Sequence, residues 1–243
     1  MVIPNIPKEY LDGTEVNNGG IFDFSDKIFD PSRINAIIKL ISKSIGGGVV
    51  SVIHLGACDH KNLIDDKIRR NEWLHKLLTE NSSQCIGFDI NEESVKYCHS
   101  IGWKNIYFLD MISQYEQVYE KISYLKKWNY LIAGEIVEHL DNPVAFLKCL
   151  NEYYKNRIDK IIITVPNAFR INNVKFSLEG KEGINTDHRY WFTPYTICKV
   201  VHRAGFKIEE LLYTGSRLIS INNQIFNLDN TVISDDLILI ASF

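Results

Sequence analysis

Five short apolar runs alternate along the chain with segments of helical periodicity. The runs are nearly continuous in hydrophobic residues, as in strands buried on both faces of a sheet; they are VVSVIHL (49–55), QCIGFDI (84–90), KNIYFLD (104–110), WNYLIAG (128–134) and DKIIITVPN (159–167). Segments 67–80, 91–101 and 143–154 between them carry apolar residues at helical spacing. This alternation predicts an α/β fold with a doubly wound parallel sheet, whose ligands bind at the carboxyl ends of the strands.

The flanking segments add two helices and two strands. One helix is predicted from Asp30-Pro31 to the glycines 46–48, and a second from the cap Thr193-Pro194 to Gly205. FKIEELLYT (206–214) and DDLILIASF (235–243) are predicted strands, and the connection 215–234 has no helix-sized pattern. Two strands joined without a crossover helix indicate an antiparallel hairpin at one edge of the sheet, seven strands in all. The turn-rich segment 1–30 is expected to be an irregular N-terminal arm.

Composition favours one ordinary globular domain over residues 1–243. Hydrophobic residues make up 45% and charged residues 23%, with a net charge of −3 and a pI near 6.2, so a nucleic-acid partner is disfavoured. No apolar run approaches the roughly 20 residues that span a bilayer, and the start MVIPNIPKEY lacks the features of a signal peptide. We therefore expect a cytoplasmic protein without a membrane partner. The five cysteines show no CxxC spacing, which favours reduced thiols over disulfides or a cysteine zinc site.

The loop after the first strand, HLGACDHKN (54–62), limits the choice of cofactor. A dinucleotide site needs G-x-G-x-x-G so that the backbone can approach a pyrophosphate, and here only Gly56 is present. Cys58 and His60 add side chains where a phosphate-binding loop is bare. A nicotinamide-dependent dehydrogenase is therefore disfavoured relative to a protein whose ligand has no phosphate, such as S-adenosylmethionine (SAM). A single glycine after a strand also fits a plain turn.

The next two strands end in aspartates. Asp89 can accept both hydroxyls of a ribose, as carboxylates do at this position of the fold; it can also cap the next helix, although Asn91 is the better cap. Asp110 and Met111 end the third strand, where this fold holds an adenine, with Asp110 facing the exocyclic amine.

A cluster of glutamate and histidine follows the fourth strand. In GEIVEHLDNP, Glu135, Glu138 and His139 stand at i, i+3 and i+4, so a helix beginning at about Glu135 would project all three from one face. Glutamates also favour a first helical turn through the helix dipole, by about 0.3–1 kcal/mol, but His139 does not. His188 lies in the loop 166–194 after the fifth strand, which neighbours the fourth in such a sheet.

Two chemical roles suit this cluster. Two carboxylates and two imidazoles can bind a divalent cation such as Mg²⁺, Mn²⁺ or Zn²⁺. Alternatively, His139 or His188 acts as a general base beside Glu138, with no metal. Either role would activate a hydroxyl acceptor, which is a poor nucleophile until it loses its proton.

The ordered set HLGACDH, WLHKLL, IGFDINEESVKY, AGEIVEHLDNP, TVPNAF and DHRYWFTPYTI...AGF resembles the SAM-dependent methyltransferases of bacterial surface-polysaccharide biosynthesis, over residues 49–213. The resemblance implies a Rossmann-like, seven-stranded class I methyltransferase with helices on both faces and residues 166–194 as a substrate loop. In its glycine-rich loop the chain departs from the family, with Gly56-Ala57-Cys58 in place of alternating glycines. By position, the implied cofactor residues are His54, Gly56, Ala57, Asp89, Ile90, Asp110, Met111, Gly134 and Glu135.

The E-x-x-E-H step also resembles the metal-binding motif of the ubiquinone-biosynthesis O-methyltransferases. Together with a later histidine, it is similar to the small-RNA 3′-terminal 2′-O-methyltransferases, in which a divalent ion holds vicinal hydroxyls. Carried over by position, the metal ligands would be Glu135, Glu138, His139 and His188.

These resemblances lead us to expect O-methylation of a sugar, nucleotide-linked or phosphorylated (including phosphoramidate-type) small molecule. The loop 166–194 carries Arg170, Lys175, Lys181 and Arg189, which suit phosphates or plain solvation, and aromatics that suit stacking or packing. His60, Trp73 and His75 could line the cofactor pocket, although Trp73 on an apolar helix face favours the core. A small-RNA or quinone-type enzyme and a non-catalytic SAM-binding protein are the alternatives.

Overall fold

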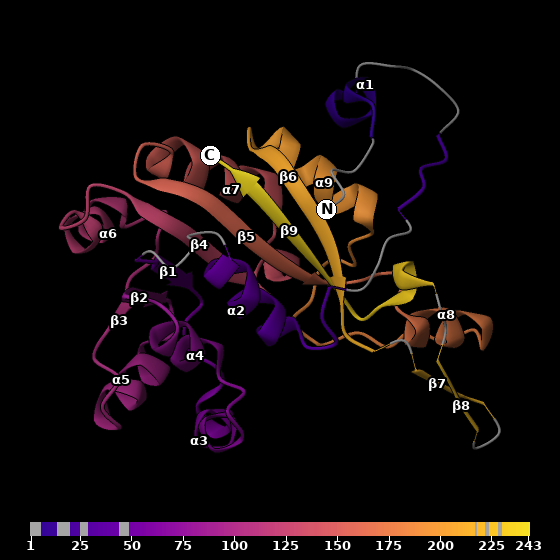
Figure 1. The fold of residues 1–243 in the computed structure, drawn as a ribbon, viewed down its shortest axis with the longest axis horizontal. Coiled ribbons are helices and arrows are strands. Elements are labelled where there is room, and N and C mark those ends of the chain that lie inside the picture. The colour runs from indigo at the N-terminus through magenta and orange to yellow at the C-terminus, as the bar shows by residue number, and fades with distance from the viewer. Residues whose placement is uncertain are drawn as a thin grey trace. The chain divides into compact units, whose positions relative to one another are not determined.

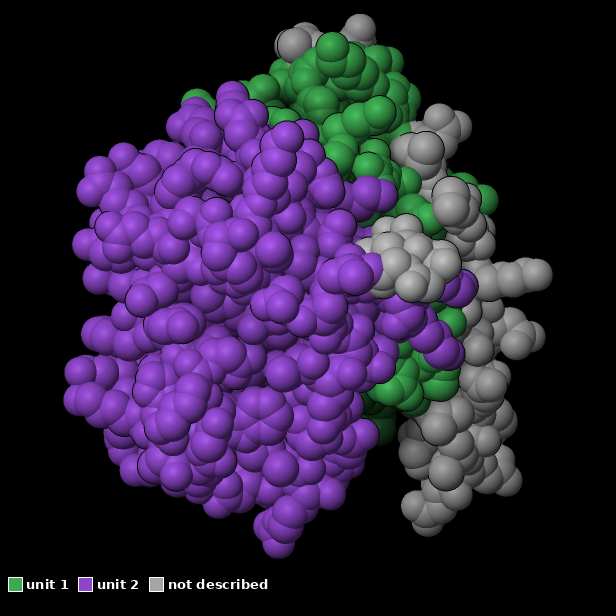
Figure 2. Space-filling view, turned by 60° about the vertical axis from the view of Figure 1, so that its left-hand side comes forward, with its two compact units in different colours: residues 1–36, 135–148, 163–242 green, residues 37–134, 149–162, 243 purple. Residues whose placement is uncertain are grey.

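The computed structural model describes residues 6–13, 20–24, 29–43, 49–216, 218–221, 224–227 and 230–243. They fall into two compact units, each built from separate stretches of chain (Figure 2). Unit 1 comprises residues 1–36, 135–148 and 163–242, and unit 2 comprises residues 37–134, 149–162 and 243. Helices α2 (Arg33–Lys43) and α7 (Pro143–Tyr154) and strand β5 (Ile158–Pro166) contribute to both units. A single domain over residues 1–243 stays a prediction.

Seven strands form one sheet in the order β3-β2-β1-β4-β5-β9-β6 (Figure 1). Strand β1 pairs in parallel with β2 and β4, β2 pairs in parallel with β3, and β6 runs antiparallel to β9. Besides β5, the strands are β1 (Ser51–Leu55), β2 (Gln84–Asp89), β3 (Ile106–Phe108), β4 (Trp128–Gly134), β6 (Lys207–Thr214) and β9 (Asp236–Ser242). The expected Rossmann-like, mostly parallel sheet with an antiparallel C-terminal pair is confirmed, and its last strand in sequence lies between β5 and β6.

The helices of unit 2 correct one prediction. Helix α5 (Glu92–Ser100) is capped by Asn91, whose side chain accepts the Ser94 N–H, as expected. The single helix predicted over 67–80 is wrong: the chain forms α3 (Lys61–Arg70) and α4 (Leu74–Glu80). The break lies at Asn71, whose φ of 59° is left-handed, a conformation that asparagine tolerates better than most residues. A further helix, α6 (Tyr115–Ile122), follows β3.

Unit 1 contains helices α1 (Lys8–Asp12), α8 (Ile171–Leu178) and α9 (Pro194–Arg203). Helix α9 begins with the predicted Thr193 cap, which forms a reciprocal capping box with Thr196. The N-terminal arm is not wholly irregular, because it contains helix α1. His202 on α9 contacts Asp12 of α1 at 2.6 Å and so fixes this short helix to α9.

Two further features of the structure were not predicted. The first is helix α8, which lies within the predicted substrate loop 166–194. In the connection 215–234, β7 (Leu218–Ile221) and β8 (Gln224–Asn227) form a separate antiparallel pair, and β7 contacts α8 (Figure 1). The predicted helix end at glycines 46–48 lies outside the described residues.

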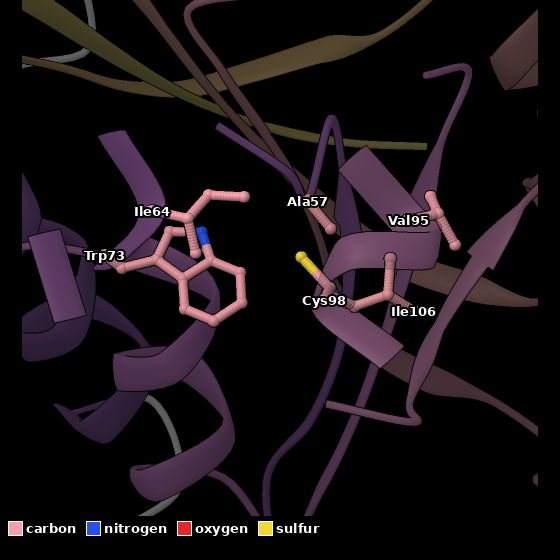
Figure 3. Close-up of a cluster of buried hydrophobic side chains, with 6 residues drawn as sticks. All are labelled: Ala57, Ile64, Trp73, Val95, Cys98 and Ile106. Atoms are coloured by element: carbon pink, nitrogen blue, oxygen red, sulfur yellow. The ribbon is translucent and has the colours of Figure 1, made fainter. Parts of the chain in front are cut away.

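A buried cluster in unit 2 supports the ends of β1 and β2. It contains Ala57 from the loop after β1, Trp73 and Cys98, among other apolar side chains (Figure 3). Trp73 is 1% exposed, so its assignment to the core is confirmed. None of the helices in the described ranges is both long enough and apolar enough to cross a bilayer.

Candidate functional site

The loop after β1 folds back over the end of β2. Parallel pairing sets Leu55 beside Phe88, so both strands end at the same edge. Gly56 then takes a left-handed φ of 68°, which glycine adopts without strain, and the N–H groups of Gly56 and Ala57 both donate to the Phe88 carbonyl. Gly87 is also required, because a Cβ there would lie 2.6 Å from the Ala57 Cβ. The single glycine of this loop therefore serves a tight turn against β2.

Asp89 is the most constrained residue at this edge. Its Oδ2 accepts the Cys58 N–H at 2.8 Å, its Oδ1 accepts the Asn91 N–H at 2.8 Å, and it is 7% exposed. Burial raises the pKa of Asp89, and the backbone N–H groups of Asn91, Cys58 and Ile90, with the Cys58 thiol, partly offset that rise. Two carboxylate oxygens offer about four acceptor positions in all, so about two remain for a ligand.

His54, predicted to contact the cofactor, is paired inside unit 2. Its ring stacks on that of His75, with the two Nδ1 atoms 3.3 Å apart. Both residues are buried, and burial lowers the pKa of His75 to about 4. One Nδ1–H of the pair can donate to the other Nδ1, and a cofactor contact by His54 stays a prediction.

The other predicted cofactor residues differ in exposure. Asp110 closes a turn, its Oδ1 accepting the Ile112 N–H at 2.7 Å. Met111 is buried, and its carbonyl accepts the Tyr154 hydroxyl at 2.6 Å. Ile90 is 73% exposed beside Asp89, and Gly134 ends β4.

Glu135 opens the cluster in unit 1 and is held in an unusual backbone conformation. Its φ is 55°, its N–H donates to the Thr164 carbonyl at 3.0 Å, and the Thr164 hydroxyl donates to its carboxylate. Arg33 donates to Thr164 Oγ1 at 3.0 Å and lies 3.2 Å from Glu135 Oε1. Thus Glu135 is ion-paired and anchored from two distant segments.

The helix predicted to begin at about Glu135 is wrong. Val137–His139 form one turn of 3₁₀ helix, and α7 begins only at Pro143, capped by Asn142. The left-handed φ of Glu135, fixed by its bonds to Thr164, prevents an α-helix from continuing through it.

Three of the four predicted metal ligands are nevertheless brought together. Glu138, His139 and His188 each offer one ligand atom, and these atoms lie within 4.8 Å of one another. Glu138 is fully buried, and neither of its carboxylate oxygens has a hydrogen-bond partner among the described residues. Burial and the charge of Glu135 raise the pKa of Glu138 to about 9.

Each histidine of this group has one ring nitrogen engaged. Nδ1 of His139 lies 3.3 Å from the carbonyl and the carboxylate of Asp187, while its Nε2 lies 3.8 Å from Glu138 Oε1. Nε2 of His188 contacts the Asn185 amide at 3.1 Å, and its buried Nδ1 has no partner among the described residues. Burial and the nearby His139 lower the pKa of His188.

Arg189 joins the loop of His188 to the turn of His139. The backbone N–H of Arg189 donates to the Glu138 carbonyl at 2.8 Å, and its guanidinium donates to the His139 carbonyl and to the Asp141 carboxylate. The Tyr190 hydroxyl adds a bond to the Asp141 carbonyl at 3.0 Å. Arg189 is therefore committed within the protein, as is Lys181, which pairs with Glu179.

Arg170 is also engaged within the protein, because its Nε–H donates to Asn173 Oδ1 at 3.0 Å, but its guanidinium in addition lies over an aromatic ring. Its guanidinium lies 4.6 Å from the centre of the Trp191 ring, and that ring lies 6.3 Å from the ring of His188. The guanidinium of Arg170, stacked on Trp191, therefore lies close to the group of Glu138, His139 and His188.

The sequence pattern does not single out Arg33, Thr164 or Asp236. Burial and the charge of Glu135 raise the pKa of Asp236 to about 7, which places it electrostatically in the cluster. Two weak signals exist: Thr164 is a polar residue inside an apolar run, and Asp236 opens the buried strand β9.

With this geometry, the fold can be compared with known proteins. No protein-family model matches the sequence, and no curated protein does. Solved structures share the class I methyltransferase fold. Magnesium protoporphyrin IX methyltransferase (ChlM) from Synechocystis PCC 6803, with bound SAH, aligns at a TM-score of 0.53 and 14% identity, covering 86% of this chain and 81% of that one.

Two Hen1 structures are also similar. The methyltransferase domain of the bacterial protein CtHen1-CN aligns at a TM-score of 0.53 and 17% identity, covering 87% of this chain and 97% of that one. The small RNA methyltransferase HEN1 aligns at 0.54 and 16%, covering 86% of this chain but 24% of that one. These likenesses establish a SAM-dependent methyltransferase fold.

Proposed function

We propose that this chain is a SAM-dependent O-methyltransferase whose acceptor is activated at Glu138, His139 and His188. The observation that carries the proposal is the buried Glu138 carboxylate, unpartnered among the described residues and grouped with two imidazoles. The shared fold with SAM-dependent methyltransferases supports the reaction class.

The residues of unit 2 fit the donor. Asp89 has acceptor capacity left for a ribose diol, and the turn at Gly56 and Ala57 holds the loop close to β2. Bound SAM would supply a methyl group on a positively charged sulfur. Asp110, Met111, Ile90 and Gly134 are proposed to complete the donor site, and donor contacts of His54 and Glu135 stay predictions.

The residues of unit 1 fit a divalent cation. Asp187 accepts from Nδ1–H of His139, which leaves the lone pair on Nε2 facing Glu138. In the structure the Nδ2–H of Asn185 donates to Nε2 of His188. Exchanging the oxygen and nitrogen of this amide would let Nε2–H of His188 donate to Asn185 and leave the lone pair on the buried Nδ1. Such outer contacts orient metal-binding histidines in other proteins. A bound Mg²⁺, Mn²⁺ or Zn²⁺ would supply a Lewis acid for the acceptor hydroxyl.

Glu135 has a separate proposed role. Its ion pair with Arg33 and its bonds to Thr164 fix the chain that leads from β4 to Glu138. Its part as a fourth metal ligand stays a prediction, because Glu135 is not in the close group of Glu138, His139 and His188.

A general base without metal is the competing mechanism. Burial and His139 lower the pKa of His188, so its imidazole is neutral at about pH 7 and able to accept a proton. The two mechanisms differ in their response to chelation.

For the acceptor, we propose a sugar- or phosphate-containing small molecule, including a nucleotide-linked intermediate of surface-polysaccharide synthesis. Arg170 stacked on Trp191 near His188 supports this, because a cation over an aromatic ring offers both a charge and a flat surface. Lys181 and Arg189 are engaged within the protein and contribute less.

A small-RNA acceptor is the second candidate. The grouped Glu138, His139 and His188 suit the vicinal hydroxyls of a terminal ribose, and two Hen1 structures share the fold. The net charge of −3 weighs against it. A quinone-type acceptor would give Arg170 no ligand to bind. A non-catalytic SAM-binding role would give Glu138, His139 and His188 no function.

Donor binding is tested by calorimetry with SAM and its demethylated product. Replacing Asp89 by asparagine should weaken SAM binding by roughly tenfold or more, because a charge-assisted acceptor becomes a neutral one. Glu92→Gln, an exposed neighbour on α5, should bind normally. No heat with either ligand would refute the function.

The cation is tested by elemental analysis and by methyl transfer before and after chelation. Metal bound by the native protein but lost in Glu138→Gln, with activity lost on chelation and restored by Mn²⁺, supports the metal role. Full activity after chelation leaves the base mechanism. Equal transfer to a terminal RNA ribose and to nucleotide sugars would favour the RNA candidate.

A further inference from the structure

Two thiols meet beside the proposed donor loop of unit 2. The Sγ atoms of Cys58 and Cys98 lie 3.7 Å apart, although the residues are 40 positions apart in sequence. All five cysteines are free. Cys58 follows Gly56-Ala57 in the loop after β1, and Cys98 lies on α5. Their contact therefore joins a loop to a helix that the sequence does not connect directly.

The two thiols differ in access. Cys58 is half-buried and packs against the edge of the apolar cluster, so it is the more accessible of the two residues. Cys98 is fully buried in the cluster that contains Ala57 and Val95, and Figure 3 shows its sulfur directed from its helix toward Ala57. The contact with Cys98, burial and the charge of Asp89 raise the pKa of the Cys58 thiol, so it attacks through a small thiolate fraction that grows with pH. Cys98, which only Cys58 can reach, is the resolving thiol.

We propose that Cys58 and Cys98 form an oxidisable dithiol site that takes a small-molecule disulfide. The Cys58 thiolate attacks one sulfur of the oxidant, breaks its S–S bond and releases one small thiol. The Cys98 thiolate then attacks the Cys58 sulfur and releases the second. One protein disulfide forms, the oxidant is reduced to two thiols, and these take up the two protons that the cysteines lose.

Formation of the bond acts on the loop. A disulfide is about 2.0 Å long, so the sulfurs must approach by about 1.7 Å from their present 3.7 Å. The Cys58 N–H holds Asp89 Oδ2, and the preceding Ala57 is already packed against β2 beside Gly87. A shift of Cys58 that closes this gap therefore disturbs the contact between its N–H and the Asp89 carboxylate. This consequence rests on the proposed donor role of Asp89.

The disulfide is tested by incubating the full chain with excess glutathione disulfide and mapping unreduced peptides by mass spectrometry. We expect one linked peptide pair, Cys58 with Cys98, which dithiothreitol reverses. Cys98→Ala should form no such link, whereas Cys198→Ala, which alters a buried cysteine on α9, should form it as the native chain does. Absence of the link from the native chain at equilibrium, or linkage of another pair in its place, overturns the proposal.

The effect on the loop is tested by calorimetry with SAM. The oxidised protein should bind SAM roughly tenfold more weakly than the reduced protein, and reduction should restore the affinity. Cys58→Ala keeps the backbone N–H that contacts Asp89 but has no attacking thiol, so it should bind SAM equally under both conditions. Equal affinity of the oxidised and reduced native chains refutes the coupling. If the reduced chain binds no SAM, the proposed function fails, and peptide mapping still decides whether the dithiol site exists.

Discussion

Replacing Glu138 by glutamine should stabilise the metal-free protein while abolishing cation binding. Glu138 is fully buried with no hydrogen-bond partner for its carboxylate among the described residues, and its pKa is raised from 4.5 to about 9. At about pH 7, folding must therefore place a proton on this side chain, which the unfolded chain has already lost. The glutamine side chain has nearly the same shape and needs no proton.

The size of the effect follows from the distance between the working pH and the unfolded pKa. That distance is about 2.5 units, and each unit costs about 1.4 kcal/mol, so the native side chain costs about 3 kcal/mol at about pH 7. Both neutral side chains leave polar atoms unpartnered, so that cost cancels to first order. The folded pKa is raised, so the native protein keeps its full stability below about pH 4.5 and loses it as the pH rises toward about 9.

The assay is urea unfolding in the presence of a chelator at several pH values, followed by the same series with Mn²⁺. In chelator, Glu138→Gln should exceed the native protein by about 3 kcal/mol at about pH 7 and match it near about pH 4.5. Cation at about a hundredfold excess over its dissociation constant should then add about 2.7 kcal/mol to the native protein alone. Glu182→Gln, exposed in the loop that carries His188, should behave as the native chain. A less stable variant in chelator, or equal stabilisation of both by Mn²⁺, would refute the reasoning.

Two further substitutions test residues that hold the proposed sites in place, Arg189 in unit 1 and His75 in unit 2. Arg189→Lys keeps the charge but loses the two-pronged contact to the His139 carbonyl and Asp141, so Mn²⁺ affinity measured by electron paramagnetic resonance should fall by about tenfold; Lys181→Met should leave it unchanged. For His75, burial lowers the pKa to about 4, so the unfolded state gains a proton first and stability falls with the pH. Between about pH 7.5 and about pH 5 the native chain should lose about 2 kcal/mol more than His75→Phe in urea unfolding, and equal losses would contradict this account.

Much of the fold could be predicted from local signals in the sequence. Apolar runs located all seven strands of the main sheet, and the cap at Thr193 and the proline at 143 marked helix starts correctly. The break at Asn71 was missed because no glycine or proline marks it. The pair β7 and β8 lies in a polar connection whose short runs carry no clear period.

The candidate site was predictable in its chemistry but not in its supports. Spacing indicated Glu138 and His139, and the strand order brought His188 to them. The turn that carries them depends on the left-handed φ of Glu135, which is set by Thr164, 29 residues away. Arg33 reaches the same point from 131 residues before Thr164. The spacing of a motif cannot predict contacts between residues that lie so far apart in the chain.

The electrostatics of unit 1 suggest why the cluster retains a buried acid at a cost to stability. Arg33 pairs with Glu135, and burial together with the charge of Glu135 raises the pKa values of both Glu138 and Asp236. A cation beside Glu138 would stabilise its ionised form and offset the cost of burying it. Because Glu138 carries a proton at about pH 7, a cation would have to displace it, so cation binding should strengthen as the pH rises toward about 9.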